Sequence, residues 1–364
     1  MTEFGQASTW SHRNTVELVC GATALARLDT LPQRRFLLVT TPGTARRGLA
    51  ERLARRLPGS VELYADVLPN PTVTMLEEAR RRWRGEGIEG LIGLGGGSAV
   101  DFAKSLAVLL ADPAGAGWHA RLIQDEQSWS QALPVVAVPT TAGTGAEVTP
   151  FATVWDFAAG RKLSMAGERL QPRLALLDPA LTFSLPAEQT LYTALDALSH
   201  ALESLWNRRQ TPLSRAYALQ ALALIGASLP VALAHPDALA ARADLQQGSL
   251  LAGLAIAQTR TALAHSISYP LTLRFGVPHG LACSFTLPRL LEANLAKLAR
   301  YSHERELLDG ILTLLRTLEL PRRLRAYASR QEILALRAHM HTPGRADNYL
   351  FEPPDIADLL EDPD

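Results

Sequence analysis

The sequence is poor in cysteine and carries no excess of either charge, and each shortage excludes a class of protein. Cys20 and Cys283 are its two cysteines, so a disulfide framework is excluded and a reducing cytoplasm is the expected compartment. Lysine and arginine together number 36, as do aspartate and glutamate. Without net charge, the chain has no bulk attraction for nucleic acid or an anionic membrane, and we expect neither as a partner.

Long apolar runs and a leader segment are missing as well. The first residues, MTEFGQASTWSHRN, are polar and lack the basic-then-apolar order of a signal peptide. The most apolar helical stretch, Ala218–Ala234, is interrupted by Gln220, Gly226, Ser228 and Pro230. A membrane span needs about 20 consecutive apolar residues, so we expect a buried helix here and no membrane association.

With 364 residues the chain is long for one core, and its two halves differ in pattern. The first half alternates short apolar runs with longer helical patterns, which is typical of a parallel sheet covered by helices. The predicted strands are Phe36–Thr40, Val61–Tyr64, Gly90–Leu94, Pro134–Val138 and Leu174–Leu177, and the predicted helices include Ala45–Leu57 and Val73–Arg84.

The second half is rich in alanine and leucine with helical periodicity from Ala187 onward, and it has no predicted strand. The change falls in Leu177–Pro186. We therefore predict an α/β domain over residues 1–182, an all-helical domain over residues 183–364, and a site in the cleft between them.

A glycine-rich loop follows the third predicted strand, in the segment LIGLGGGSAVDFAK (Leu91–Lys104). Glycines let backbone N–H groups approach an anion closely, and the following helix adds partial positive charge, so a pyrophosphate is the expected ligand. The spacing fits neither a P-loop nor a GxGxxG fingerprint. A tight strand-to-helix turn with Ser98 as helix N-cap remains the alternative.

A second loop, PTTAGTGAEVT (Pro139–Thr149), also follows a predicted strand. Its hydroxyls and glycines suit a ribose and a nicotinamide, although threonine also favours ordinary polar turns. Two such loops at the ends of different strands of one sheet favour a dinucleotide site. The predicted cofactor-binding residues of the two loops are Gly96, Gly97, Ser98, Asp101, Thr140, Thr141, Thr144 and Thr149.

Histidines and an aspartate in the second half could hold a metal. Asp196 and His200 are four residues apart, which places them on one helix face. His265 and His279 follow, fourteen residues apart. Three imidazoles and one carboxylate can bind a divalent ion and leave a position open for a substrate oxygen. His200 could instead be a core histidine bonded to Asp196, and spacing alone does not join this pair to the later histidines.

Taken together, these residues resemble the iron-containing (group III) alcohol dehydrogenase family over nearly the whole chain. The two loops look like the pyrophosphate and nicotinamide loops of the family, and Asp196, His200, His265 and His279 match its metal ligands. The resemblance implies a dinucleotide-binding α/β domain, a helical metal domain, hydride transfer between NAD(P)H and a small aldehyde, one divalent metal (Fe²⁺ or Zn²⁺), and a homodimer. It also implies that Asn70 and Lys162 lie near the cofactor.

Three positions depart from the family pattern. Tyr269 stands where the family commonly has a histidine near the substrate, so its hydroxyl could act on the substrate or its ring could merely pack; we class it with His279 as catalytic. Phe151 replaces a small polar residue. Thr41 replaces an acidic residue at a strand end, which together with Arg46 and Arg47 favours NADP(H) over NAD(H).

The segments TPFATVWD (Thr149–Asp156) and ESLWN (Glu203–Asn207) are similar to a subgroup that reduces phosphonoacetaldehyde to 2-hydroxyethylphosphonate. An anionic substrate needs cationic anchors, and the candidates are Arg161, Lys162, Arg208, Arg209 and Arg274. Three alternatives remain: a generic short-chain enzyme such as a lactaldehyde or propanediol oxidoreductase, a metal-dependent lyase or cyclase on the same fold, and a dinucleotide-sensing protein with a structural metal.

Overall fold

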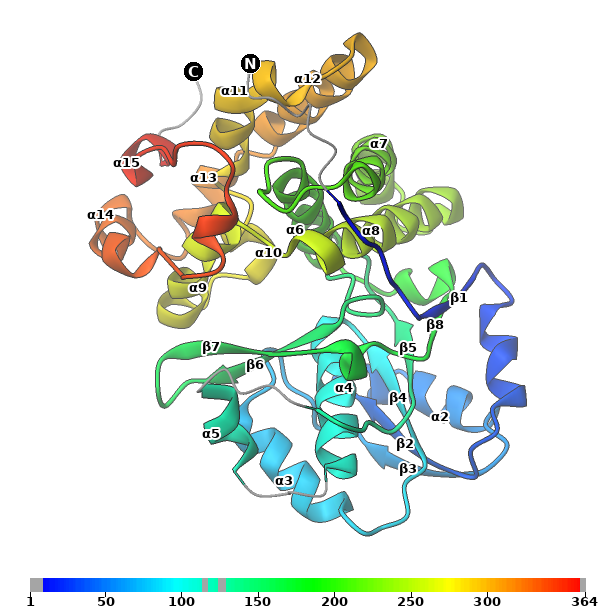
Figure 1. The fold of residues 1–364 in the computed structure, drawn as a ribbon. Helices are drawn as coiled ribbons and strands as arrows, with labels where there is room; N and C mark the ends of the chain where they lie inside the picture. Colours follow the sequence, from blue (N-terminus) through cyan, green and yellow to red (C-terminus); the bar gives the residue numbers. More distant parts are fainter. Residues whose placement is uncertain (1–8, 113–116, 124–128, 361–364) are drawn as a thin grey trace.

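The computed structural model describes residues 9–112, 117–123 and 129–360, so the first eight residues of the polar N-terminal stretch lie outside the described residues. The chain forms an α/β half and a helical half; Figure 1 shows the α/β half at the bottom and the helical half at the top. The strands of the main sheet are β1 (Glu17–Cys20), β2 (Arg35–Thr40), β3 (Ser60–Tyr64), β4 (Gly90–Gly95), β5 (Val135–Pro139) and β8 (Leu174–Leu177).

The main sheet is entirely parallel, with the strand order β1-β8-β5-β4-β2-β3. Alternate side chains of β2 enter different cores: Leu37 and Val39 pack on one face of the sheet, and Phe36 and Leu38 on the other. Both faces are therefore buried, which explains why the central strands read as uninterrupted apolar runs. The predicted parallel sheet is confirmed.

Helices cover both faces of this sheet. They are η1 (Ala24–Thr30), α1 (Pro42–Arg46), α2 (Leu49–Ala54), α3 (Val73–Trp83), α4 (Gly97–Ala111) and α5 (Trp118–Ile123), followed later by η2 (Glu168–Leu170) and η3 (Pro179–Thr182). The predicted single helix Ala45–Leu57 is wrong, because Gly48 adopts φ 72° and separates α1 from α2. A left-handed residue ends a helix, and glycine adopts that conformation without steric penalty.

Three strands lack the uninterrupted apolar runs of the central strands and were not predicted from the sequence. β1 lies at the edge of the sheet, and β6 (Phe151–Asp156) pairs with β7 (Arg161–Ala166) in a separate antiparallel hairpin. β7 begins with Arg161 and Lys162 and is mostly half-buried. Edge and hairpin strands bury one side only, so polar residues interrupt their apolar pattern. A prediction based on apolar runs therefore misses them.

The helical half consists of α6 (Ala187–Leu205), α7 (Pro212–Ala234), α8 (Leu239–Thr259), α9 (Leu263–Phe275), α10 (His279–Ala282), α11 (Leu287–Leu298), α12 (Ser302–Thr317), α13 (Leu320–Leu324), α14 (Arg330–Ala335), η4 (Arg337–His339), η5 (Ala346–Asn348) and α15 (Ile356–Leu359). Among the described residues, α7 alone is long and apolar enough to cross a membrane. Its Leu222, Ile225 and Leu229 are fully buried in the helical core, against α6 and α8.

The change from strand to helix falls between the end of β8 at Leu177 and the start of α6 at Ala187. The chain before β1 also contacts the helical half, where the rings of His12 and Tyr217 lie 6.0 Å apart. The division into separate domains at residues 182 and 183 stays a prediction.

Candidate active site

A cavity of about 570 Å³ lies where the two halves meet, and it is lined by residues from both. All predicted site residues but one line it: Thr41, Asn70, Gly96, Gly97, Ser98, Asp101, Thr141, Thr144, Thr149, Lys162, Asp196, His200, His265, Tyr269 and His279. The exception is Thr140, which is buried and whose N–H donates to the Gly95 carbonyl at 2.9 Å. Thr140 therefore joins the two loops rather than facing the cavity.

The glycine-rich loop presents the start of α4 to this cavity. Gly96 is the N-cap of α4 and no side chain caps the helix, so the alternative with Ser98 as N-cap is wrong. Ser98 Oγ instead accepts a hydrogen bond from the N–H of Asn70 at 3.3 Å. The first helical N–H groups thus lack a side-chain acceptor of their own, which suits an anion at this point.

The threonine loop packs directly against the glycines. A Cβ on Gly97 would lie 2.5 Å from Thr144 Cγ2, so no larger residue fits there without displacement. Lys104, which is fully buried, fixes the two loops together: its Nζ donates to Asp101 Oδ1 at 3.2 Å, to the Ala146 carbonyl at 2.9 Å and to Thr149 Oγ1 at 3.2 Å. This role of Lys104 was not predicted from the sequence.

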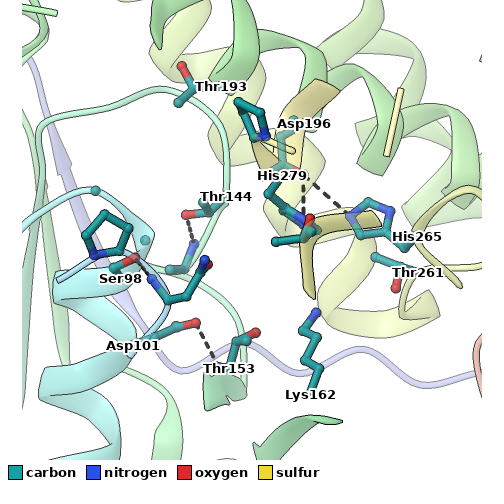
Figure 2. Close-up of a pocket in the computed structure, with 18 of the residues that line it drawn as sticks. Ser98, Asp101, Thr144, Thr153, Lys162, Thr193, Asp196, Thr261, His265 and His279 are labelled. Carbon is teal, nitrogen blue, oxygen red and sulfur yellow. Dashed lines mark hydrogen bonds and ion pairs between the residues drawn. The ribbon is translucent and has the colours of Figure 1, made fainter. Parts of the chain in front are cut away.

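Across the cavity, the predicted metal ligands converge on one carboxylate (Figure 2). The Nε2 atoms of His200, His265 and His279 lie 3.3, 3.4 and 3.8 Å from Asp196 Oδ1. Asp196 and His200 lie one turn apart on α6, His265 is on α9, and His279 opens α10. A Cβ on Gly280 would lie 1.8 Å from the Tyr192 carbonyl, so glycine there lets α10 approach α6.

Cys283 also lies next to this group. Its Sγ is 3.5 Å from Asp196 Oδ1, and the nearest donor atoms of Asp196, His265, His279 and Cys283 all lie within 4.8 Å of one another. Burial and the negative charge of Asp196 hold the pKa of the Cys283 thiol well above its usual range. Cys283 and His200 thus both lie close to Asp196 Oδ1, and His200 stays the predicted fourth ligand.

Electrostatics in the cluster favour a cation. Burial opposes charge on Asp196, but His200, His265 and His279 outweigh it and hold the pKa of the carboxyl below its usual range. Burial lowers the pKa of His200 to about 4 and that of His279 to about 3. Both imidazoles are therefore neutral near pH 7, the form that binds metals.

Glu203 orients His265, and this role of Glu203 was not predicted from the sequence. It is completely buried on α6; its Oε2 lies 2.6 Å from His265 Nδ1, and its Oε1 accepts the His265 N–H at 3.2 Å. Burial opposes charge on His265, yet Glu203 and Asp196 raise its pKa to about 10, so a metal ion would bind this ring by replacing its proton. The position of Glu203 seven residues after Asp196, on the same helix face, was the signal that could have revealed it.

The buried Nε2 of His265 makes no hydrogen bond to a described residue, and its contact with Asp196 Oδ1 at 3.4 Å is shared with His200 and His279. A buried nitrogen that lacks a hydrogen bond is rare in native structures, and a ligand at this point would satisfy it. With Glu203 on Nδ1, this ring has the arrangement in which a carboxylate orients a metal-binding histidine. The residues present therefore fit a divalent metal.

Tyr269 lies in the same cavity, with the Nζ of Lys162 4.1 Å from its ring centroid. Burial would raise the pKa of this phenol, but Lys162, Arg345 and His265 outweigh it and lower it to about 8. Lys162 comes from β7 in the α/β half, so it reaches across the cavity (Figure 2).

Among the five cationic anchors proposed from the sequence, Lys162 lines the cavity and Arg161, Arg208, Arg209 and Arg274 do not. Arg260 and Arg345, which were not predicted from the sequence, line it instead. Neither stands in a motif, so no sequence signal pointed to them.

Comparison with known proteins gives a family for each half of the chain. Residues 15–179 match the family described as iron-containing alcohol dehydrogenase, and residues 190–358 match the C-terminal part of the Fe-containing alcohol dehydrogenase family.

Individual relatives agree with this match. The NAD-dependent methanol dehydrogenase of Bacillus methanolicus is 32% identical over 328 residues, covering 89% of this chain and 83% of the relative. The phosphonoacetaldehyde reductase of Streptomyces viridochromogenes is 39% identical over 288 residues, covering 75% and 72%. The crystal structure of sulfoacetaldehyde reductase from Bifidobacterium kashiwanohense in complex with NAD⁺ superposes with a TM-score of 0.83 at 27% identity, covering 97% of each chain.

Proposed function

Because the chain belongs to the iron-containing alcohol dehydrogenase family, and is thus an oxidoreductase acting on CH–OH donors, we propose that it reduces a short aldehyde bearing an anionic group with NADPH as hydride donor. The observation that supports this proposal is the single cavity with a helix N-terminus on one side and the cluster of Asp196 and three histidines on the other. Such a cavity can hold a dinucleotide and a carbonyl together.

Asp196, His200, His265 and His279 would hold the metal, with Fe²⁺ and Zn²⁺ as candidates. A divalent ion supplies Lewis-acid polarisation of a carbonyl oxygen when bound. Glu203 keeps the Nε2 of His265 free for it by holding Nδ1. Asp196, His200 and His265 are buried, and burial strengthens their electrostatic interaction with a bound ion.

The opposite side would bind the cofactor, which carries the hydride. The backbone of Gly96, Gly97 and Ser98 lies at the start of α4, where a pyrophosphate fits. Thr144 and Thr149 offer hydroxyls to the ribose and the nicotinamide, and Lys104 holds their loop against α4.

For the cofactor type, Thr41 leaves the end of β2 without a carboxylate, and it lines the cavity. Arg47 reaches Thr44 Oγ1 at 3.3 Å beside it. A 2′-phosphate would be accommodated here rather than repelled. We expect Thr41→Asp to shift the ratio of kcat/KM values toward NADH; comparable kcat/KM for the two cofactors in the unchanged enzyme would contradict the NADPH proposal.

Phosphonoacetaldehyde is the leading substrate, since relatives with 39% identity and with a TM-score of 0.83 are named for phosphonated and sulfonated acetaldehydes. The test is a panel of aldehydes assayed with NADH and NADPH after loading with Fe²⁺ or Zn²⁺. Reduction of phosphonoacetaldehyde at least tenfold better than propanal supports the proposal, and equal kcat/KM for the two contradicts it. A homodimer in the cytoplasm is the proposed state, testable by light scattering of the purified protein.

A further inference from the structure

Arg260 has an unusual backbone conformation at the point where α8 ends. Its φ of 62° and ψ of 176° are strained for a residue with a side chain, and within the described ranges only Asn70 and Glu319 share a positive φ among non-glycine residues. Its guanidinium lies 4.4 Å from the centroid of the Phe151 ring, and it lines the cavity. Strain of this kind persists where the surrounding structure enforces it, and it is common at functional sites.

Two buried asparagines enforce this conformation. Asn207 Nδ2 donates to the Arg260 carbonyl at 3.1 Å, and Asn348 Nδ2 donates to the Thr261 carbonyl at 2.9 Å. The Asn348 carbonyl in turn accepts the N–H of Arg208 at 2.8 Å. These bonds join the turn after α6, the end of α8 and the segment at η5.

Arg345 precedes η5 in this joined region, and it lines the same cavity. Burial first, and then the charges of Arg345 and Arg209, lower the pKa of Arg260 to about 10. Like charges held near one another destabilise a fold unless an anion offsets them. The arrangement therefore calls for a counter-charge.

The described residues supply no such counter-charge. None of the three cations Arg260, Arg345 and Lys162 forms an ion pair within the described part of the chain. The carboxylates that line the cavity belong to Asp101, which pairs with Lys104, and Asp196, which lies among the histidines. A negative charge on a ligand would thus find two arginines and a lysine that form no ion pair with a described residue.

The position of these cations relative to the histidine cluster points to the substrate. Tyr269, Arg260 and Arg345 line the cavity together with the predicted metal ligands, and the Nζ of Lys162 lies 4.1 Å from the Tyr269 ring centroid. Figure 2 shows Ser98, near the start of α4 where the pyrophosphate fits, across the cavity from His265 and His279. An anion at Arg260 and Arg345 would be the tail of the substrate rather than part of the cofactor.

We propose that Arg260 and Arg345 form the subsite that binds the anionic group of the substrate, and that a tetrahedral dianion such as a phosphonate is its preferred ligand. This inference rests on the proposed function, in which the carbonyl lies at the histidine cluster. Guanidinium groups bind such oxygens through paired, charge-assisted hydrogen bonds, which a lysine cannot reproduce.

The kinetic test compares Arg260→Gln and Arg345→Gln with the unchanged enzyme on two aldehydes of similar length, phosphonoacetaldehyde and propanal. Losing charge-assisted hydrogen bonds lowers kcat/KM for phosphonoacetaldehyde by about 10- to 100-fold, while propanal stays within about twofold. Arg274→Gln is the matched control, because this exposed arginine on α9 does not line the cavity and we expect no change on either aldehyde. Equal losses on both aldehydes, or no loss on either, would overturn the subsite.

A binding measurement separates this inference from the proposed function. Calorimetric titration with 2-hydroxyethylphosphonate needs no turnover, and Kd is expected to rise about 10- to 100-fold in both arginine variants while Arg274→Gln is unchanged. If the enzyme reduces no aldehyde but this pattern appears, the reaction is wrong and the anion subsite stands. If the unchanged, correctly folded protein binds no phosphonate, the subsite is wrong whatever the enzyme reduces.

Discussion

The two sides of the cavity present different kinds of chemical group. The α/β side offers mainly backbone groups and hydroxyls, at Gly97 and Thr144 for example, together with Lys162 and with Asp101, which pairs with Lys104. The helical side offers titratable side chains: three imidazoles, a carboxylate, a phenol and two unpaired arginines. Substitutions change side chains while backbone groups remain, so substrate preference can be altered on the helical side without disturbing cofactor binding.

Removing a predicted metal ligand gives the largest effect that tests this contrast. We expect His279→Ala to lose bound metal and to lower turnover to background, because the remaining groups leave the cluster incomplete. Metal content measured by mass spectrometry and NADPH binding measured by fluorescence check the two sides separately.

Cofactor binding and the thermal unfolding of the α/β half should be retained in the His279→Ala variant. If the variant kept near-normal metal content and rate, His279 would not be a ligand. If it lost cofactor binding as well, the two sides of the cavity would not act independently.

Tyr269→Phe tests whether the phenol adds chemistry to the helical side. If its hydroxyl donates to the substrate, kcat/KM for reduction falls by roughly 10²- to 10⁴-fold in the variant. With a pKa lowered to about 8, the hydroxyl is present below that pH and lost as pH rises through it, so activity of the unchanged enzyme declines above about pH 8. The measurement is the pH profile of kcat/KM for both proteins.

A Phe variant that keeps the rate and the alkaline decline would show that the ring of Tyr269 only packs the cavity. The profile is compared as a ratio of variant to unchanged enzyme, so that titrations shared by both proteins cancel.

Gly97→Val gives the smallest expected effect and acts on the α/β side. A Cβ there meets the Thr144 side chain at 2.5 Å, so the two loops must separate. Overpacking of about 1–3 kcal/mol corresponds to roughly 5- to 150-fold weaker NADPH binding, with metal content unchanged. Gly310→Ala on α12, where a Cβ meets no atom within 4 Å, is the control. Unchanged NADPH affinity in Gly97→Val would show that the loops do not bind the cofactor.

Much of the fold could be predicted because the central strands are buried on both faces. β2, β4 and β5 read as apolar runs, and their positions in one parallel sheet are confirmed. β7 could not be found in this way, since a half-buried hairpin strand that starts with Arg161 and Lys162 has no apolar run.

The candidate site was predictable where residues are close in sequence. Four-residue spacing placed Asp196 and His200 on one helix face, and the resemblance to the family, now confirmed, added His265 and His279. Arg260 and Arg345 were missed because only tertiary packing brings them to the cavity. The local sequence pattern does not indicate such tertiary contacts.

The bonds from the two asparagines have a consequence for the order of folding. Asn207 and Arg260 are 53 residues apart, and Asn348 and Thr261 are 87 apart. Closing long loops carries a large entropic penalty, so contacts of this separation form late. During synthesis the arginine region cannot assemble until the segment that contains Asn348 has left the ribosome. In refolding from denaturant, helical circular dichroism should return before the affinity for a phosphonate, and the interval between the two measures how late this corner of the molecule is completed.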